Sequence, residues 1–423
     1  MRHIVWIGWG ALGAFLVGII LLNLWPHEKK LQHRLQHVSA VDSVQFQREI
    51  GTLLGASVVE GNAVTDFQNG VEFFPAMLKS IRGAQRSINM ETYIYWSGEI
   101  AGEFADALIE RAHAGVKVHV LADWVGSVPM PKALVDRLRA GGVRFEYFHP
   151  LSWYSLNRIN NRTHRKLLIV DGTVGFNGGA GIADEWNGNA TRPDHWRDMQ
   201  FRVEGPAAAQ MQAVFADNWL TTAGETLLGD DYYPATPRVG SMSVQAFASS
   251  PDGNSINMEL LYLMAINGAR HRIDLESAYF VPDELSLTAL LDALRRGVQV
   301  RIVVPGPYVD SRVVRNASQQ KWGVLLRAGA HFFQFQPSLF HNKLMVVDSY
   351  LTIGGSANFD NRSFQLNDES NLVIPDRMFA AHMIQVIDGD IGRSREVNLA
   401  QWRDRPWTRR VSDWFSALAA SQL

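Results

Sequence analysis

Short β-branched runs and stretches of helical period alternate along this chain, and the whole alternation occurs twice. In the first half the runs lie at 116–123 and 166–171, and in the second half they lie at 298–305 and 343–348. Between them, apolar residues recur at helical spacing. This order predicts an α/β fold in which helices cover a sheet. Because the runs are almost uninterrupted, we expect strands that are buried on both faces.

The two halves also match in local sequence, which indicates a duplication. Glu91 corresponds to Glu276, and the segments that follow the two glutamates match as well. Only two copies occur, so the pattern is a duplication and not a solenoid. A stretch rich in Gly, Asp and Pro at Leu228–Gly240 predicts the seam. We therefore place one half at 49–230 and the other at 240–400, packed together as a pseudo-dimer.

The N-terminus carries a long apolar run over residues 4–25, in which Asn23 is the only strongly polar side chain. A helix of this length would span the hydrocarbon core of a bilayer. No small-residue cleavage site follows, so an uncleaved single-pass anchor over 1–30 is favoured over a signal peptide. Basic residues flank both ends, and the positive-inside rule places the body at the cytoplasmic side of the inner membrane. Polar residues 31–48 predict a helical linker.

Two copies of a His-x-Lys-x₄-Asp motif stand at matching places in the two halves, each followed by a Gly pair or Gly-Ser at the same offset. Strand side chains alternate, so the His and the Lys of each copy point to the same face. The ammonium group would neutralise the non-bridging oxygens of a phosphodiester. Two imidazoles would supply a nucleophile and a general acid/base. A single copy could be accidental, but two predict a metal-independent phosphodiester-transferring enzyme whose catalytic set is His164, Lys166, Asp171, His341, Lys343 and Asp348.

Longer strings around the motifs carry a resemblance to a known family. They lie at 164–186 and 196–206 in the first half, and at 279–283 and 358–371 in the second. The chain resembles the phospholipase D superfamily, and in detail its bacterial cardiolipin synthase branch, from about Gly61 to the C-terminus. The resemblance implies a duplicated phospholipase D-like fold, a phosphohistidine intermediate, and no metal or other cofactor.

The same resemblance implies a role for each site residue. His164 would be the nucleophile and His341 the general acid/base, although sequence alone does not fix their order. The two motif lysines would hold the phosphoryl oxygens. Asp198 and Glu369 are candidates to accept the far ring N–H of a histidine, as carboxylates do in catalytic triads. For the two motif aspartates at the strand ends, we expect support through backbone and loop hydrogen bonds rather than direct chemistry.

The resemblance also implies substrate contacts. Ser356 and Asn358 would add hydrogen-bond donors to the phosphate, and Gly179 is the first-half counterpart of Ser356. The family usually has Asn where this chain has Gly181, so one donor is missing in the first half. For the paired glutamates of the duplicated pattern, a role at the rim of the site and a plain structural role both remain open.

Composition narrows the substrate class. The net charge is −2, from 40 basic and 42 acidic side chains, and there is no cysteine. Proteins that act on nucleic acid usually show an excess of basic side chains. The near-equal numbers of basic and acidic side chains therefore weaken the alternative hypothesis of a membrane-anchored nuclease. The leading hypothesis is a membrane-bound phosphatidyltransferase that makes cardiolipin from phosphatidylglycerol. Hydrolysis to phosphatidic acid is the nearby alternative, and a scaffold with a degenerate site is a more distant one. The expected partners are phospholipids and the membrane, with no nucleic acid, and the sequence does not determine the oligomeric state.

Two further segments have apolar residues that invite a membrane interpretation. Tyr147–Asn157, just before the first motif, would be either a packed loop or an interfacial lip that admits lipid. The tail over 401–423 would be either an amphipathic helix at the membrane surface or a helix docked on the protein. The apolar residues concerned are Trp153, Tyr154 and Leu156 in the loop, and Trp407, Val411, Trp414, Phe415 and Leu418 in the tail.

Overall fold

The computed structural model describes residues 33–150, 160–251 and 256–417, together with a few isolated positions nearer the N-terminus. Apart from those positions, the predicted anchor lies outside the described residues, and so do the three apolar residues of the proposed lip. Within the described part of the chain, no helix is both long and apolar enough to cross a membrane.

The first half forms a mixed sheet. Strands β2, β3 and β4 run parallel, and β6, β7 and β8 continue the sheet antiparallel from the other side of β2. The strands of this half are β1 (Val59–Gln68), β2 (Ser87–Thr92), β3 (Lys117–Asp123), β4 (Arg144–Phe148), β5 (Arg162–Thr163), β6 (Leu167–Val170), β7 (Val174–Gly178) and β8 (Met199–Glu204).

The second half repeats this arrangement. Strands β10, β12 and β13 run parallel, and β14, β15 and β17 continue antiparallel from β10. Its strands are β9 (Met242–Ser249), β10 (Arg272–Ser277), β11 (Phe280–Val281), β12 (Gln299–Pro305), β13 (His331–Phe335), β14 (Lys343–Val347), β15 (Leu351–Gly355), β16 (Phe359–Asp360), β17 (Asn367–Pro375) and β18 (Ser394–Val397). The predicted duplication is therefore confirmed.

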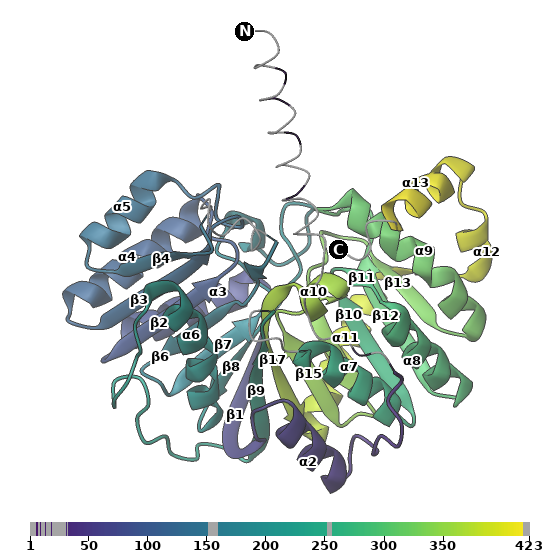
Figure 1. Cartoon of the computed structure of the whole chain (residues 1–423), viewed down its shortest axis with the longest axis horizontal. Helices are drawn as coiled ribbons and strands as arrows, with labels where there is room; N and C mark the ends of the chain where they lie inside the picture. Colours follow the sequence, from purple (N-terminus) through teal and green to yellow (C-terminus); the bar gives the residue numbers. More distant parts are fainter. Residues whose placement is uncertain are drawn as a thin grey trace.

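The two half-sheets join edge to edge into one sheet of 16 strands (Figure 1). At the seam β1 pairs with β8 and β9, and β9 pairs with β17. The short strand β5, which directly precedes the first motif, also pairs with β17. Strands of one half therefore hydrogen-bond directly to strands of the other, which fixes the two motifs relative to each other.

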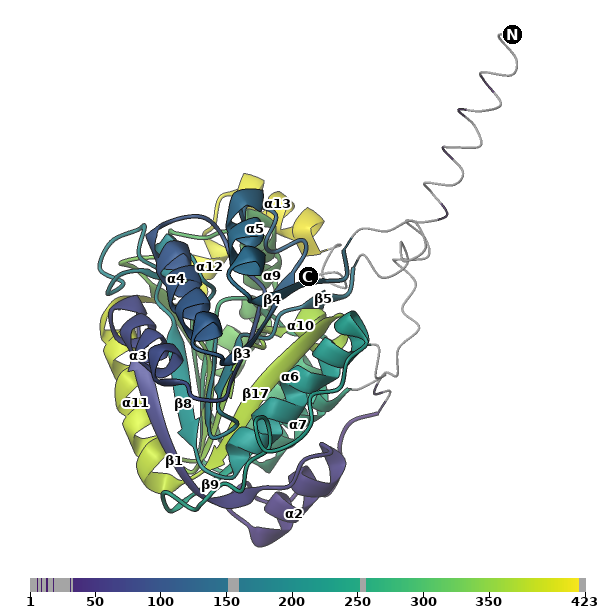
Figure 2. The ribbon, with the colours of Figure 1, turned by 90° about the vertical axis from the view of Figure 1, so that its left-hand side faces the viewer.

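Helices cover both faces of the sheet. Figure 2 shows α3 and α11 on one side of it and α6 and α7 on the other. Alternate residues of β6 enter different cores, Leu168 beside α3 and α4 and Leu167 beside α6, which confirms the predicted burial on both faces. The longer helices are α3 (Gly70–Gly83), α4 (Glu99–His113), α5 (Lys132–Ala140), α6 (Ala207–Ala223), α7 (Asn257–Gly268), α8 (Glu284–Arg295), α9 (Arg312–Ala328) and α11 (Arg377–Gly392), and the short ones are η2 (Asp184–Trp186) and α10 (Asn361–Gln365).

The segments near the two ends of the described chain form helices that pack on the second half. Helix α2 (Val44–Leu53) starts inside the expected linker and buries Phe46 and Ile50 in the core of the second half, among residues of α7. The linker over 31–48 is thus in part a packed element, because two apolar residues one turn apart give it a face to bury. At the other end, α12 (Leu399–Arg403) and α13 (Trp407–Ala417) pack on α9.

Candidate active site

A cavity of about 290 Å³ lies where the two motifs meet. His164 and Lys166 line it from the first half, and His341 and Asn358 line it from the second. The motifs meet there because β6 and β14 begin at the sheet edge where the parallel strands β2 and β10 end. Residues just after β2 and β10 therefore lie at the same edge of the sheet as the motif residues just before β6 and β14.

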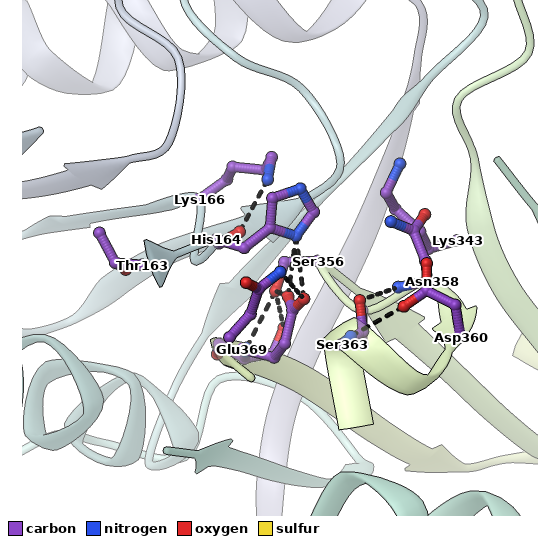
Figure 3. Close-up of polar contacts among 12 residues, drawn as sticks. Thr163, His164, Lys166, Lys343, Ser356, Asn358, Asp360, Ser363 and Glu369 are labelled. Carbon is purple, nitrogen blue, oxygen red and sulfur yellow. Dashed lines mark hydrogen bonds and ion pairs between the residues drawn. The ribbon is translucent and has the colours of Figure 1, made fainter. Parts of the chain in front are cut away.

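The first histidine is held by a carboxylate of the opposite half. His164 Nδ1 lies 3.0 Å from both carboxylate oxygens of Glu369, which is on β17 (Figure 3). Ser356 Oγ donates to the same carboxylate at 2.5 Å. A hydrogen bond from Nδ1–H to Glu369 would leave Nε2 with its lone pair directed away from this carboxylate, as nucleophilic or basic chemistry requires.

The second histidine shows the reciprocal arrangement. His341 Nδ1 lies 2.7 Å from Asp198 Oδ2, and Trp186 Nε1 donates to the same oxygen at 2.8 Å. Asp198 belongs to the first half and directly precedes β8, whereas His341 belongs to the second. Each half thus supplies the carboxylate that orients the other half's imidazole, so the site needs both halves in place.

Backbone pairing across the seam sets this geometry. The His164 N–H donates to the carbonyl of Asp368, the residue before Glu369, at 2.8 Å. The His341 N–H donates to the carbonyl of Arg197, the residue before Asp198, also at 2.8 Å. Each histidine is therefore hydrogen-bonded through its backbone to the residue next to its carboxylate, which leaves the ring little freedom.

The two motif lysines share the buried site. Lys166 Nζ donates to the His164 carbonyl at 2.7 Å, and Lys343 Nζ donates to the His341 carbonyl. Burial lowers the pKa of Lys166 to about 7 and that of Lys343 to about 8, against the attraction of nearby carboxylates. Lys343 also repels the charge of Lys166. A phosphodiester anion between them would relieve this repulsion, which makes the pair suited to bind one.

Burial sets the protonation of the catalytic imidazoles and carboxylates as well. It lowers the pKa of His164 to about 4 and that of His341 below its ordinary value, so both rings are neutral near pH 7. Burial alone would raise the pKa of Glu369, but His164, Lys166 and Ser356 outweigh it and lower that pKa to about 2. His341 and Lys343 likewise outweigh burial and lower the pKa of Asp198. A neutral imidazole beside an ionised carboxylate is the reactive combination of a catalytic triad.

Asp171 and Asp348, although included in the predicted catalytic set, do not line the cavity. Asp171 follows the far end of β6 and accepts hydrogen bonds from the backbone N–H groups of residues 85–87, before β2. Asp348 does the same for residues 270–272, before β10. Each carboxylate ties the end of a motif strand to the start of its neighbour, which is the supporting role expected for it.

The substrate-binding set divides in the same way. Asn358 lines the cavity, and its Oδ1 has no hydrogen-bond partner among the described residues. Ser356 instead donates to Glu369 and accepts from the Ser370 N–H at 2.9 Å, so it supports the carboxylate and does not reach the cavity. Gly179 leaves room for Asp198, because a Cβ there would stand 2.2 Å from Asp198 Oδ1. Of the three predicted substrate-binding residues, Asn358 lines the cavity, and Ser356 and Gly179 do not.

The missing asparagine at Gly181 has a steric explanation. A Cβ at this position would lie 2.8 Å from the Ile94 Cβ, so Ile94 occupies the space that a longer side chain would need. Ile94 lines the cavity in the first half, whereas Asn358 and Tyr279 line it in the second. At this position the first half therefore presents the apolar side chain of Ile94 to the cavity, whereas the second half presents Asn358.

The paired glutamates, Glu91 and Glu276, lie behind the motifs and are fully buried. Glu91 accepts from Thr163 Oγ1 at 2.5 Å and from Asn218 at 2.7 Å. Glu276 accepts at 2.8 Å from Asn342, the residue between His341 and Lys343. Burial raises the pKa of Glu91 to about 7 and that of Glu276 to about 8. Neither lines the cavity, so the geometry favours the structural role over a role at the rim.

Several residues of the cavity wall were not predicted as site residues. Asp310 and Trp196 stand near His341, and Arg162 and Arg362 line the wall as well. Tyr279, Arg362 and Trp196 belong to the strings that carry the family resemblance. Asp310 has no such signal, and only its place after the parallel strand β12 could have indicated it. Within the described residues, no group of three His, Asp or Glu side chains could hold a metal ion.

Comparisons with known proteins agree with this geometry. The family described as "Cardiolipin synthase, PLD-like domain" matches residues 77–219 and 262–391, which is one match for each half. The chain belongs to this family. It is 35% identical over 394 residues to "Cardiolipin synthase 2" of Bacillus anthracis, covering 92% of this chain and 74% of that protein. It is 34% identical over 366 residues to "Cardiolipin synthase A" of Pseudomonas entomophila (strain L48), covering 86% and 75%. The predicted family is thus confirmed.

Solved structures show the same fold at low sequence identity. The phosphatidylserine synthase of Haemophilus influenzae Rd KW20 superposes with a TM-score of 0.66 at 12% identity, over 89% of this chain and all of that one. The polyphosphate kinase of Porphyromonas gingivalis superposes with a TM-score of 0.54, also at 12% identity, over 88% of this chain and 53% of that one. These likenesses confirm the phospholipase D-like fold as such.

Proposed function

We propose that this protein is a phospholipase D-type phosphatidyltransferase that makes cardiolipin from two molecules of phosphatidylglycerol through a phosphohistidine. The observation that carries the proposal is the reciprocal pair of histidine–carboxylate contacts, His164 with Glu369 and His341 with Asp198, at one cavity. The family match and the named relatives supply the substrate class.

In the first step, His164 Nε2 attacks the phosphorus of the donor lipid. The bond from phosphorus to the glycerol oxygen breaks, and this oxygen takes a proton from His341. Lys166 and Lys343 neutralise the non-bridging oxygens during the attack, and Asn358 borders the same cavity. The donor anion favours protonation of His341, whose pKa burial lowers below its ordinary value. Free glycerol leaves, and the phosphatidyl group remains on His164.

In the second step, a hydroxyl of another phosphatidylglycerol attacks the phosphohistidine. Its proton passes to His341, the bond from phosphorus to nitrogen breaks, and cardiolipin forms. Glu369 keeps the His164 ring in one orientation throughout, and Asp198 does so for His341. Water in place of the second lipid would give phosphatidic acid by the same steps, so access of the acceptor decides between transfer and hydrolysis.

Lipid substrates place this reaction at a membrane. We propose that residues 1–30 anchor the chain in the inner membrane, that the catalytic body faces the cytoplasm, and that the two halves span about 49–230 and 240–400. The apolar run at 4–25 and the basic residues around it support this placement.

The test is product analysis. Purified full-length protein in detergent, given phosphatidylglycerol and a chelator, is expected to release one glycerol for each cardiolipin formed. Cardiolipin, phosphatidic acid and glycerol are quantified by mass spectrometry. The variants His164→Ala and His341→Ala are the matched controls, and both should lack turnover. A wild-type protein that forms neither cardiolipin nor phosphatidic acid, or that cleaves a DNA oligonucleotide as fast as lipid, contradicts the proposal.

A further inference from the structure

Helix α13 packs on α9 on the side that carries Asp413. Asp413 is buried and pairs with Arg405 at 3.4 Å, and Asn316 of α9 donates to Ser412 Oγ at 2.9 Å. The tail is therefore docked on the protein, as one of the two interpretations of its sequence expected. The hydrogen bond and the ion pair are polar contacts, however, and the apolar residues Trp407, Val411, Trp414 and Phe415 remain exposed.

The exposed side, which we call the α13 face, consists of Trp407, Val411, Trp414 and Phe415. These residues recur at helical spacing on one side of α13, and exposed fractions reach 74% for Trp407 and 61% for Phe415. A helix that exposes two tryptophans and a phenylalanine on one side departs from the usual pattern of a soluble protein. Large exposed aromatic patches mark binding surfaces, and tryptophan favours the membrane interface.

Two loops at the same sheet edge continue the apolar surface around the cavity. After β3, Val125 and Val128 are exposed, and the cavity residue Trp96 donates to the carbonyl of Gly126 in this loop at 2.8 Å. After β12, Tyr308 in the loop and Val313 in the first turn of α9 are exposed on either side of Asp310, which lines the cavity. Each half therefore exposes apolar residues close in sequence to residues that line the cavity, Trp96 in the first half and Asp310 in the second.

A basic groove lies beside α13, where Arg409 and Ser412 border it. This arginine groove has a volume of about 430 Å³ and is lined by Arg315, Arg395 and Arg409 together with amide side chains of α9 and β13, and no carboxylate lines it within the described residues. Burial and the nearby charges of Arg409 and Arg312 lower the pKa of Arg315, which shows positive charge only partly compensated by Asp413. Arg410 is exposed close to the α13 face.

We propose that the α13 face and the arginine groove bind an anionic lipid surface, so that the cavity opens toward the bilayer. The aromatic residues enter the headgroup boundary, and the arginines take headgroup phosphates. A second copy of this chain fits less well, because pairing two α13 faces would bring their flanking arginines together. Membrane binding is inferred from the α13 face and the arginine groove alone. A role of this binding in substrate entry rests on the proposed phosphatidyl transfer.

The first test measures depth in the bilayer. The chain has no cysteine, so Trp414→Cys and Leu53→Cys each carry one environment-sensitive label. The two positions are matched in exposure, at 53% and 54%, and Leu53 lies on α2 at the opposite end of the molecule (Figure 1). In vesicles of phosphatidylcholine and phosphatidylglycerol with nitroxide-bearing lipid, we expect strong quenching at 414 and little at 53. Equal quenching overturns the proposal, as does self-quenching of the 414 label in lipid-free detergent, which would indicate a second copy.

The second test concerns the charge. The measured quantity is the increase in quenching of the label at position 414 when phosphatidylglycerol is added to the vesicles. Replacing both Arg315 and Arg409 by Gln should reduce this increase by roughly fivefold for each arginine. The control replaces Arg238 and Arg377, which are exposed and paired with Glu60 and Asp42 far from the groove. Equal effects of the two double variants, or quenching that does not depend on phosphatidylglycerol, would count against an anionic surface.

A third test links docking to turnover. Serine at Trp407, Trp414 and Phe415 together should lower the ratio of turnover on bilayer phosphatidylglycerol to turnover on a short-chain soluble analogue by about tenfold. The control replaces the exposed apolar residues Val44, Leu53 and Met378, which lie outside the α13 face. An unchanged ratio refutes a role in substrate entry. If the wild-type protein turns over neither lipid, the proposed reaction fails while the quenching still decides the docking.

Discussion

Replacing Glu369 by Gln removes the charge beside His164 and keeps a side chain of the same size. In the folded protein the pKa of Glu369 falls from 4.5 to about 2, because His164, Lys166 and Ser356 stabilise its charged form more than burial disfavours it. At 1.36 kcal/mol per pH unit, this difference corresponds to about 3 kcal/mol. Since the folded pKa is the lower one, this stabilisation is present above pH 4.5 and is lost as the pH falls toward 2.

The same interaction should act on the reaction. When His164 attacks phosphorus its ring becomes positively charged, and Glu369 faces that charge at 3.0 Å from Nδ1. If the transition state loses most of the 3 kcal/mol in Glu369→Gln, kcat falls roughly a hundredfold. KM should change little, because Glu369 does not line the cavity. The assay is initial-rate cardiolipin formation from phosphatidylglycerol near pH 7, with circular dichroism to verify folding.

The matched control is Glu396→Gln, since Glu396 also contacts a histidine, His331 Nδ1 at 2.9 Å, but on the exposed surface. Exposed pairs contribute little, so this variant should keep wild-type kcat. A folded Glu369→Gln protein with more than about a third of wild-type kcat would refute the reasoning. A fall that appears only in KM would do so as well.

Three further outcomes follow from the same geometry. Acid-quenched intact-mass analysis with phosphatidylglycerol should detect a phosphatidyl adduct on the His341→Ala protein and none on His164→Ala; the reverse would exchange the two roles. Gly179→Ala should lower kcat about tenfold, because the added methyl group would displace Asp198. Gly102→Ala, on α4, should leave kcat unchanged, because nothing lies within 4 Å of the added methyl group. Equal kcat values for the two variants would argue against steric displacement of Asp198. Because the lysine pKa values near 7 and 8 belong to the free enzyme and the ammonium forms bind phosphate, kcat/KM should fall as the pH rises through that range, and a flat profile to pH 9 would contradict it.

The sequence by itself determined the reaction type and the outline of the fold. The doubled motif, its strand-like alternation and the matching segments around Glu91 and Glu276 are local patterns, and local patterns set which side chains share a face of a strand. The motif supplied His164, Lys166, His341 and Lys343, and the family resemblance added Asp198, Ser356 and Glu369, which the structure brings together.

Only the tertiary structure decided how these residues pair and what surrounds them. His164 and Glu369 are 205 residues apart, and His341 and Asp198 are 143 apart. Such pairs depend on the order of strands at the seam, where β5 joins β17 across the two halves, and no local period encodes that order. The same long-range packing directs Asp171 and Asp348 away from the cavity, fills the space at Gly181 with Ile94, and turns the aromatic side of α13 toward solvent. Side-chain alternation specifies a face of the sheet, but only the assembled sheet specifies the neighbours on that face.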